Sequence, residues 1–430
     1  MSCRTPGCPG VEADAFEGIT MFRNLTRTLA ALLLVCLVSL PVALRGQRSP
    51  TIRTLTEQEM VDMMQGSSIQ ASRSSATEPM VKQVKDAVAQ GRKFTMISVD
   101  DVPDDWTVVV PVGVGGGGAW EYVRERTQKQ NLQTIPDASV RAIQALSKHT
   151  GKKIDALIRF EGAAATMQTF MAASALNLPV VDACPVGRSV PEIEMQLTLI
   201  NGGLPFAPAA AVSRWGDVIV LDKSVDAYRG EDIFRALAVA SGGGVSAVQN
   251  MMSGKDMKPH VIKGAVSTAI QYGKTLREAR AGHQDPVAAL LKASNGYKLF
   301  RGTVTKADMK GDRGFTWWDV EIRGTNEYTG HTYKLFLKNE NIIAWLDGKP
   351  DAMLPDIIVD LDPKTGDTLF GQGLGAYPMN ADVVMVGIPN TTMWRTPKGL
   401  EVMGPRHFGY DIDYTPMEQL QKSRPKFGTK

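Results

Sequence analysis

The stretch Leu178-Pro-Val-Val-Asp-Ala-Cys-Pro-Val-Gly-Arg-Ser-Val-Pro-Glu-Ile-Glu-Met-Gln196 decides the fold, because a buried strand directly precedes a turn rich in reactive side chains. Residues 178–181 form a short apolar run that predicts a strand, and Pro185 and Gly187 then force the chain to turn. In open sheets built from alternating strands and helices, ligands bind where strands end. We therefore expect chemistry at the polar residues of this turn, which are Asp182, Cys184, Arg188 and Glu192.

The chain on the N-terminal side of this stretch alternates between helical and extended patterns. The expected helices are Leu55 to Met64, Met80 to Gln90, Ser139 to His149 and Thr166 to Leu176. The expected strands are Phe94 to Val99, Thr107 to Val112 and Asp155 to Phe160, with a small-residue loop at residues 66–76. Such alternation predicts an α/β domain with a mostly parallel or mixed sheet over residues 54–230.

After residue 230 the pattern changes. Three further helices are expected at Glu231 to Ala240, Val245 to Met252 and Lys263 to Arg280. From Tyr297 onward the chain runs in short alternating or apolar segments separated by turns such as Pro363-Lys-Thr-Gly366. Residues 231–425 are therefore expected to form a helical segment followed by a β-rich domain, either a sandwich or a barrel.

The first 47 residues have the features of a targeting leader. Arg23 and Arg27 precede the apolar run Leu29 to Leu44, as in a secretory signal peptide that starts at Met21. This run of 16 residues is short for a membrane span, although an uncleaved anchor remains an alternative. We expect an exported protein, periplasmic or secreted, with a linker at residues 48–53 and membrane contact only through an uncleaved leader.

Composition limits the kinds of partner. The formal net charge is +3, and lysines and arginines do not cluster with aromatic residues, so nucleic-acid binding is not expected. A small molecule is the expected ligand, and a homo-oligomer remains open. The five histidines are scattered without metal-ligand spacing, which predicts no metal site and leaves the cofactor unknown.

Two other features are candidates for the site. A glycine run at Gly115, Gly116, Gly117 and Gly118 follows an expected strand, so its amides could bind an anion, or the run could be a closely packed turn. Glu161 also follows a strand and could face Asp182, or it could cap the next helix. Cys184 is the only cysteine beyond the leader, and it could be a nucleophile or a buried small hydrophobic residue.

Several motifs follow one another along the chain, namely residues 178–192, Lys338-Asn-Glu-Asn-Ile-Ile343, Pro355-Asp-Ile-Ile-Val359 with residues 363–367, and Gly404-Pro-Arg-His-Phe-Gly-Tyr410. Together they resemble the S-methyl-thiohydantoin desulfurase family, also known as DUF917, and the resemblance implies kinship of role with hydantoin-processing enzymes. The resemblance implies an N-terminal α/β domain, a C-terminal β-rich domain, and hydrolytic removal of a methylthio group from a hydantoin-like ring. The chain departs from the family pattern at Cys184, where family members tend to have a second aspartate.

The leading hypothesis is a hydrolase-like protein that adds water to a ring carbon of a small cyclic amide or thioimidate. Asp182 or Glu161 would be the general base, and Arg188 or the glycine amides would stabilise negative charge. Glu192 would orient Arg188 or act as the acid, and Cys184 could instead attack directly. The rival hypothesis is a non-catalytic exported protein that keeps the fold and binds a small molecule.

Overall fold

A computed structural model describes residues 50–72, 77–369, 377–425 and 427. The predicted leader at residues 1–47 and the start of the linker lie outside the described residues. Residues Pro50–Lys430 belong to one compact unit that contains both domains. In the part of the chain that the structure describes, every helix is too short or too polar to span a bilayer.

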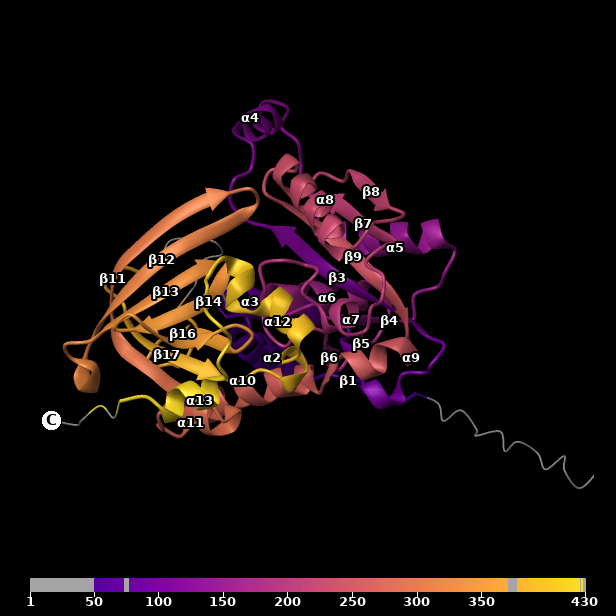
Figure 1. Ribbon diagram of the computed structural model, residues 1–430. Coiled ribbons are helices and arrows are strands. Elements are labelled where there is room, and N and C mark those ends of the chain that lie inside the picture. The colour runs from indigo at the N-terminus through magenta and orange to yellow at the C-terminus, as the bar shows by residue number, and fades with distance from the viewer. Residues whose placement is uncertain (1–49, 73–76, 370–376, 426, 428–430) are drawn as a thin grey trace, which may run out of the picture. The chain divides into compact units, whose positions relative to one another are not determined.

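The N-terminal domain is built on an eight-stranded mixed sheet (Figure 1). The strands lie in the order β1 (Ile52–Thr54), β2 (Thr95–Ile97), β5 (Val180–Val181), β4 (Ala156–Ile158), β3 (Thr107–Gly115), β9 (Gly244–Ser253), β7 (Ala209–Ser213) and β8 (Val218–Leu221). The inner run from β2 to β3 is parallel, and the remaining pairs are antiparallel. The inner strands are apolar and buried, as expected for a sheet covered on both faces.

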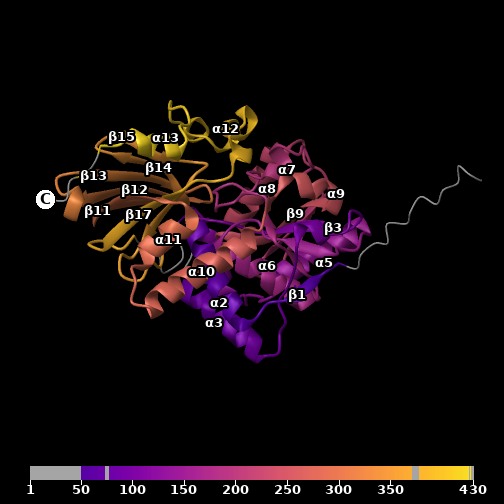
Figure 2. The same ribbon diagram turned by 90° about the horizontal axis from the view of Figure 1, so that it is seen from below.

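Helices cover this sheet and join it to the second domain. They are α2 (Glu57–Gln70), α3 (Thr77–Ala89), α4 (Glu121–Lys129), α5 (Ala138–Thr150), α6 (Ala163–Leu176), α7 (Leu197–Ile200), α8 (Ala227–Ala240), α9 (Gly254–Met257), α10 (Ala265–Ala281) and α11 (Pro286–Ser294). Thr56 and Glu59 form a capping box that fixes the start of α2. Helix α2 packs closely on α10, where Gly66 and Gly273 leave no room for a side chain, and Figure 2 shows these helices side by side.

The C-terminal domain is a curved antiparallel sheet, drawn mostly in orange in Figure 1. Its strand order is β15 (Lys349–Met353), β14 (Glu340–Leu346), β13 (Thr332–Lys338), β12 (Phe315–Gly324), β11 (Tyr297–Asp312), β17 (Asp382–Ile388) and β16 (Ile357–Leu361). Two short helices, α12 (Pro397–Met403) and α13 (Met417–Lys422), follow it. Between them, residues Pro405–Phe408 form a single 3₁₀ turn. The predicted fold class, an α/β domain followed by a β-rich domain, is confirmed.

Two of the predicted elements are wrong. Val245 to Met252 was expected to be a helix, but this segment is strand β9, which pairs with β3 on one side and β7 on the other. Its valines and buried alternating side chains suit a central strand, and pairing on both sides outweighs its local helical pattern. The loop expected from residue 66 begins later, because α2 continues through its small residues to Gln70.

The motif that follows β5 forms a second, very short ladder. Residues Ala183–Cys184 (β6) pair antiparallel with Ile262–Lys263 (β10), directly before α10. This ladder ties the predicted reactive turn to the start of α10. The rest of the turn, residues 185–196, then runs between the two domains.

Candidate functional site

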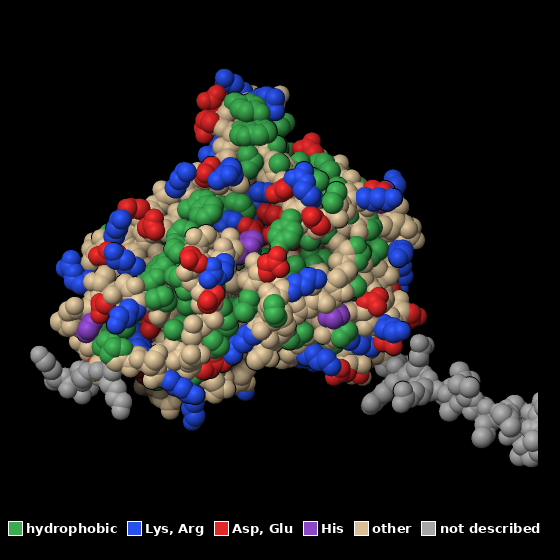
Figure 3. All heavy atoms as spheres, viewed as in Figure 1, with side chains coloured by type: hydrophobic (Ala, Val, Ile, Leu, Met, Phe, Trp, Pro, Cys, Tyr) green, Lys and Arg blue, Asp and Glu red, His purple; other side chains and the backbone are tan. Residues whose placement is uncertain are grey.

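A cavity of about 820 Å³ lies between the two domains. The α/β domain contributes lining side chains from the turn after β6, from the glycine loop and from α8. The β-rich domain contributes the β11–β12 hairpin, the end of β13 and the 3₁₀ turn before α13. Figure 3 shows acidic, basic and histidine side chains gathered around a hollow in this face of the molecule. The polar residues that line the cavity are Glu192, Glu194, Glu231, Asp232, Arg235, Asp312, Arg313, Lys338 and His407.

Glu192 joins the two domains inside this cavity. Its Oε2 atom lies 2.7 Å from Nε2 of His407, and its Oε1 atom pairs with the ammonium of Lys338. Burial opposes ionisation, but the hydrogen bond to His407 and the charge of Lys338 lower the pKa of Glu192 to about 2. Glu192 is therefore an ionised carboxylate that holds an imidazole and an ammonium in place.

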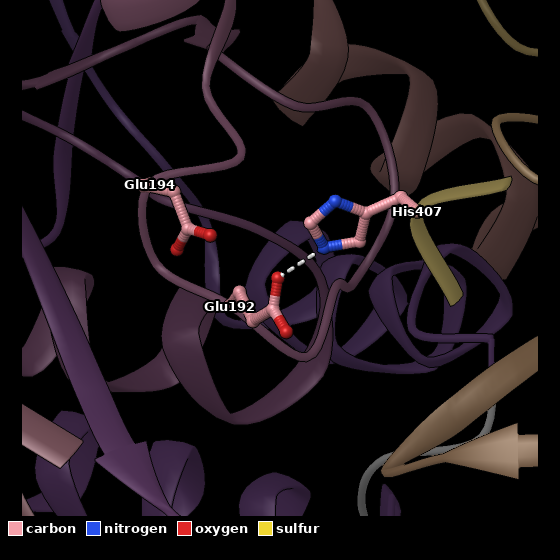
Figure 4. Close-up of side chains that lie close together, drawn as sticks. All are labelled: Glu192, Glu194 and His407. Atoms are coloured by element: carbon pink, nitrogen blue, oxygen red, sulfur yellow. Dashed lines mark hydrogen bonds and ion pairs between the residues drawn. The ribbon is translucent and has the colours of Figure 1, made fainter. Parts of the chain in front are cut away.

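Glu194, two residues further along, faces the same point from the other side, as Figure 4 shows. Its side chain is buried, and its Oε2 atom has no hydrogen-bond partner among the described residues. Burial, together with the negative charges of Glu231 and Glu192, raises the pKa of Glu194 well above its ordinary value. One ligand atom each from Glu192, Glu194 and His407 lies within 4.8 Å of the other two.

Arg235, on α8, fixes the walls around these groups. Its guanidinium donates to Glu231 Oε1 at 2.7 Å, to the carbonyl oxygens of Gly115 and Gly314, and to that of Pro191. It therefore links the turn that carries Glu192 to the glycine loop and to the β11–β12 hairpin. Glu231 in turn accepts a hydrogen bond from the backbone amide of Ile193, between the two carboxylates. Arg235 and Glu231 therefore connect the walls of the cavity through hydrogen bonds.

Aromatic side chains form much of the remaining wall. The ammonium of Lys338 lies 4.0 Å from the ring centre of Phe315 and 5.2 Å from that of Trp317. Trp120 and Tyr228 line the cavity from the α/β domain. Flat faces near a fixed cation and a carboxylate suit a small planar ligand with polar edges.

Of the predicted site residues, Asp182 lies outside the cavity lining. Its Oδ1 atom accepts hydrogen bonds from the backbone amides of Val266 and Ser267, at 2.9 and 3.0 Å. Its Oδ2 atom bonds to the hydroxyl of Ser267. The carboxylate therefore satisfies the free amides at the start of α10.

Cys184 is buried in the core of the α/β domain. Its Sγ atom donates to the carbonyl oxygen of Phe160 at 3.1 Å and accepts from the amides of Val186 and Gly187. Burial raises the pKa of the thiol above its ordinary value. This environment matches the small buried residue that was the alternative to a nucleophile.

Arg188 is fully buried and lies outside the cavity lining. It donates to the carbonyl oxygens of Ser189, Asp356 and Asn341 and to the hydroxyl of Ser72. These partners come from both domains, so the side chain is a junction between them.

Glu161 lies close to this junction. Its Oε2 atom accepts a hydrogen bond from the amide of Val190 at 2.8 Å. Burial raises the pKa of Glu161 to about 8. It belongs to the buried neighbourhood of Arg188 and Glu340 rather than to the cavity lining.

The glycine run packs against the backbone of the β11–β12 hairpin. A Cβ atom added at Gly116 would overlap the carbonyl oxygen of Gly314, and one at Gly117 would press on Gly311. The amide of Gly116 donates to Gly243, and that of Gly117 to the hydroxyl of Thr316. Of the four predicted glycines, Gly118 lines the cavity. Gly116, Gly117 and Gly118 allow the two domains to approach closely, whereas Gly115 packs against Gly243 within the α/β domain.

The structure thus places two predicted site residues at the cavity, Glu192 among its charged groups and Gly118 in its lining. It adds three charged residues that were not predicted, Glu194, Lys338 and His407. Glu194 lay inside the quoted stretch, but its role depends on burial that spacing does not reveal. Lys338 and His407 are part of two motifs that carried the family resemblance, 338–343 and 404–410. Those motifs were the available signal for them.

The fold and the cavity define a two-domain protein whose α/β and β-rich parts share a polar pocket. Residues 59–223 match the S-Me-THD-like N-terminal domain and residues 225–417 match the S-Me-THD-like C-terminal domain. The chain therefore belongs to the S-Me-THD-like family, DUF917, as the motifs indicated.

Among solved structures, the fold is similar to the X-ray structure of a structural genomics target from Chromobacterium violaceum. The two share 20% sequence identity with a TM-score of 0.68, over 85% of this chain and 100% of that chain. This likeness supports the fold. A comparison with curated proteins gave no match.

Proposed function

We propose that this protein is a hydrolase that removes a methylthio group from an S-methyl-thiohydantoin-like ring. Membership of the S-Me-THD-like family supports this class of substrate. The observation that carries the proposal is the convergence of Glu192, Glu194 and His407 in one cavity, beside an ammonium and aromatic walls.

The cavity suits a flat five-membered ring. Trp317 lines one wall, beside Phe315, whose ring is covered by Lys338 and Arg235. Trp120 and Tyr228 line the wall of the other domain. A ring of this kind has apolar faces and polar edges, so it can stack on aromatic side chains while its edges meet charged groups. A volume of about 820 Å³ leaves room for the ring, a ring substituent and a water molecule.

The chemistry proceeds by addition and elimination. Water held at the Glu192, Glu194 and His407 cluster attacks the ring carbon that bears sulfur, and a proton goes to the adjacent ring nitrogen. The new C–O bond then becomes a carbonyl while the C–S bond breaks, and the hydroxyl proton passes to sulfur. The products are hydantoin and methanethiol, so one water is consumed and no oxidant or reductant is needed.

The side chains have separate tasks in this scheme. The imidazole of His407 and the carboxylate of Glu192 relay the protons, because they are hydrogen-bonded to each other and both line the cavity. The ammonium of Lys338 stabilises negative charge that develops on the ring. Glu194 completes the water site from the opposite side.

The test is release of methanethiol by the purified full-length chain, measured with a thiol-reactive dye on an S-methyl-thiohydantoin. We expect His407→Asn and Glu192→Gln to lower kcat/KM by about 10²- to 10⁴-fold, the usual loss when a proton-transfer group is removed. His331→Asn is a matched control, because His331 forms a similar 2.6 Å contact with Asp347 at the exposed surface. It should keep full activity.

The outcomes separate this proposal from the alternative of a non-catalytic binding protein. Saturable binding of the ring by calorimetry without thiol release would favour the binding protein. Thiol release that survives both cavity substitutions would place the chemistry elsewhere in the chain.

We also infer that the protein is exported. The apolar run Leu29 to Leu44 after Arg23 and Arg27 supports this location. The intact mass of protein recovered from the periplasm or medium would test it, because removal of the leader gives a defined loss of mass. Full-length mass in the cytoplasmic fraction would contradict it.

A further inference from the structure

We propose that Glu192, Glu194 and His407 bind one divalent transition-metal cation, such as Zn²⁺ or Mn²⁺. The inference concerns the pocket of the proposed function and rests on that function for its role. The bound cation would polarise the attacking water in place of proton acceptance by His407 and Glu192, which would then be its ligands. Binding itself needs no turnover, so it can be tested separately.

The donor set is of the right kind. Two carboxylates and one imidazole lie within 4.8 Å of one another, and small side-chain rotations bring three such atoms to about 2.0–2.2 Å from one ion. Three protein ligands leave a coordination position for water, as in catalytic zinc sites. The surrounding cavity gives that water access to a substrate.

An independent observation concerns Glu194. Its side chain is 1% exposed, and its Oε2 atom has no donor within the described residues. It is aimed at the Glu192–His407 contact, as Figure 4 shows. When Glu194 is ionised, its buried oxygen lacks a donor and its charge faces that of Glu192, and both effects are unfavourable. A cation between them removes both penalties.

The positively charged side chains of the cavity pair with carboxylates other than Glu194. Arg235 pairs with Glu231, and Arg313 lies 3.5 Å from Asp312. Lys338 pairs with Oε1 of Glu192. In the described ranges, no lysine or arginine forms an ion pair with Glu194. The place next to Glu194 is therefore open to an added positive charge.

The Oε2 atom of Glu192 is also placed to bind the cation. Lys338 occupies Oε1, while Oε2 meets Nε2 of His407 through a single hydrogen bond. A cation can replace the proton of that hydrogen bond and bind both atoms. The amide of Ile193, held by Glu231, fixes the backbone between the two carboxylates, so little rearrangement is required.

The experiment is calorimetric titration of the chelator-treated, dialysed full-length chain with ZnCl₂ and with MnCl₂ alone. We expect one cation per chain, with affinity at least about tenfold weaker in Glu194→Gln and in His407→Asn. His331→Asn is the control and should bind as the native chain does. Electron paramagnetic resonance of bound Mn²⁺ provides a second readout. Circular dichroism confirms that each variant is folded, and His407→Asn remains informative if Glu194→Gln fails to fold.

No saturable binding of either cation, or equal binding by Glu194→Gln and His331→Asn, would overturn the inference. Cation binding without methanethiol release would support the inference and count against the hydrolase. Methanethiol release that persists after chelation, with no cation bound, would contradict the metal site and support the hydrolase.

Discussion

The two halves of the stretch from Asp182 to Gln196 differ in how their polar groups are satisfied. In the first half, Asp182, Cys184 and Arg188 have backbone or hydroxyl partners for their side chains. In the second half, Glu192 contacts two groups across a cavity, and an oxygen of Glu194 has no donor in the described part of the chain. The first half joins elements together, and the second half faces the cavity.

This difference separates structural from functional polar residues. A buried polar side chain with every partner supplied by the protein contributes to folding and has little left to offer a ligand. A buried group with a missing partner, next to a cavity, is costly to keep and is therefore a better sign of binding. By this criterion Glu194 marks the candidate site, and Glu192 and His407 belong to it because their ligand atoms lie within 4.8 Å of those of Glu194.

The largest expected effect comes from the junction. Replacing Arg188 by methionine should lower the free energy of unfolding by about 3–5 kcal/mol, because several buried acceptors lose their charged donor at once. Those acceptors include the carbonyl oxygens of Asp356 and Asn341. Urea unfolding at neutral pH measures the change.

The matched substitution is His407→Asn, in the cavity. It should leave the free energy of unfolding within about 1 kcal/mol of the native value, since only one hydrogen bond is altered. Equal losses of stability in the two variants would remove the distinction between junction and cavity.

Much of the fold follows from the order of patterns along the sequence. Helical and extended periods before residue 230 predicted the α/β domain, and the alternating segments after Tyr297 predicted the β-rich one. Strand β9 was mistaken for a helix because its position depends on β3 and β7, which lie far away in the sequence. Local pattern cannot report pairing of that kind.

The site was less accessible to sequence reasoning. The sequence predicts a site in the turn after β5, and Glu192 of this turn lines the cavity. Proximity to a strand end does not show which side chains point inward or find partners, so Asp182 and Arg188 looked equivalent to Glu192. His407 reaches the cavity from 215 positions further along the chain, a contact that spacing alone cannot predict.

A smaller effect is expected at the glycine loop. Gly116→Ala should cost about 1–3 kcal/mol, because its methyl group would overlap the backbone of the β11–β12 hairpin. Gly91→Ala is the control, since Gly91 also has positive φ but no atom within 4 Å of an added Cβ. Thermal unfolding of both variants separates overlap from backbone strain. Equal losses of stability in the two variants would mean that the overlap with the β11–β12 hairpin does not destabilise Gly116→Ala.

The junction should also show a pH dependence through Glu161. Burial raises the pKa of its carboxyl to about 8 in the folded protein, so the folded state holds a proton that the unfolded state releases near pH 4.5. The native chain therefore loses stability as pH rises from about 4.5 to 8. Glu161→Gln lacks this titration, so its stability relative to the native chain should rise by up to about 1.4 kcal/mol per pH unit.

Urea unfolding at pH 5, 6.5 and 8 measures this difference. Asp382→Asn is a suitable control, because Asp382 is a surface carboxylate paired with Arg301. If the difference in the free energy of unfolding between Glu161→Gln and the native chain stays constant with pH, Glu161 is ionised in the folded state.

The smallest effect is expected at Cys184, where it decides between two mechanisms. A serine hydroxyl can donate to Phe160 and accept from Gly187 as the thiol does, so Cys184→Ser should cost about 1 kcal/mol or less. Methanethiol release should stay within about twofold of the native rate, because the thiol is buried and absent from the cavity lining. Loss of turnover in a folded Cys184→Ser variant would instead support direct attack by the thiolate. The reactive centre would then lie in the first half of the stretch, among the residues whose partners are all supplied by the protein.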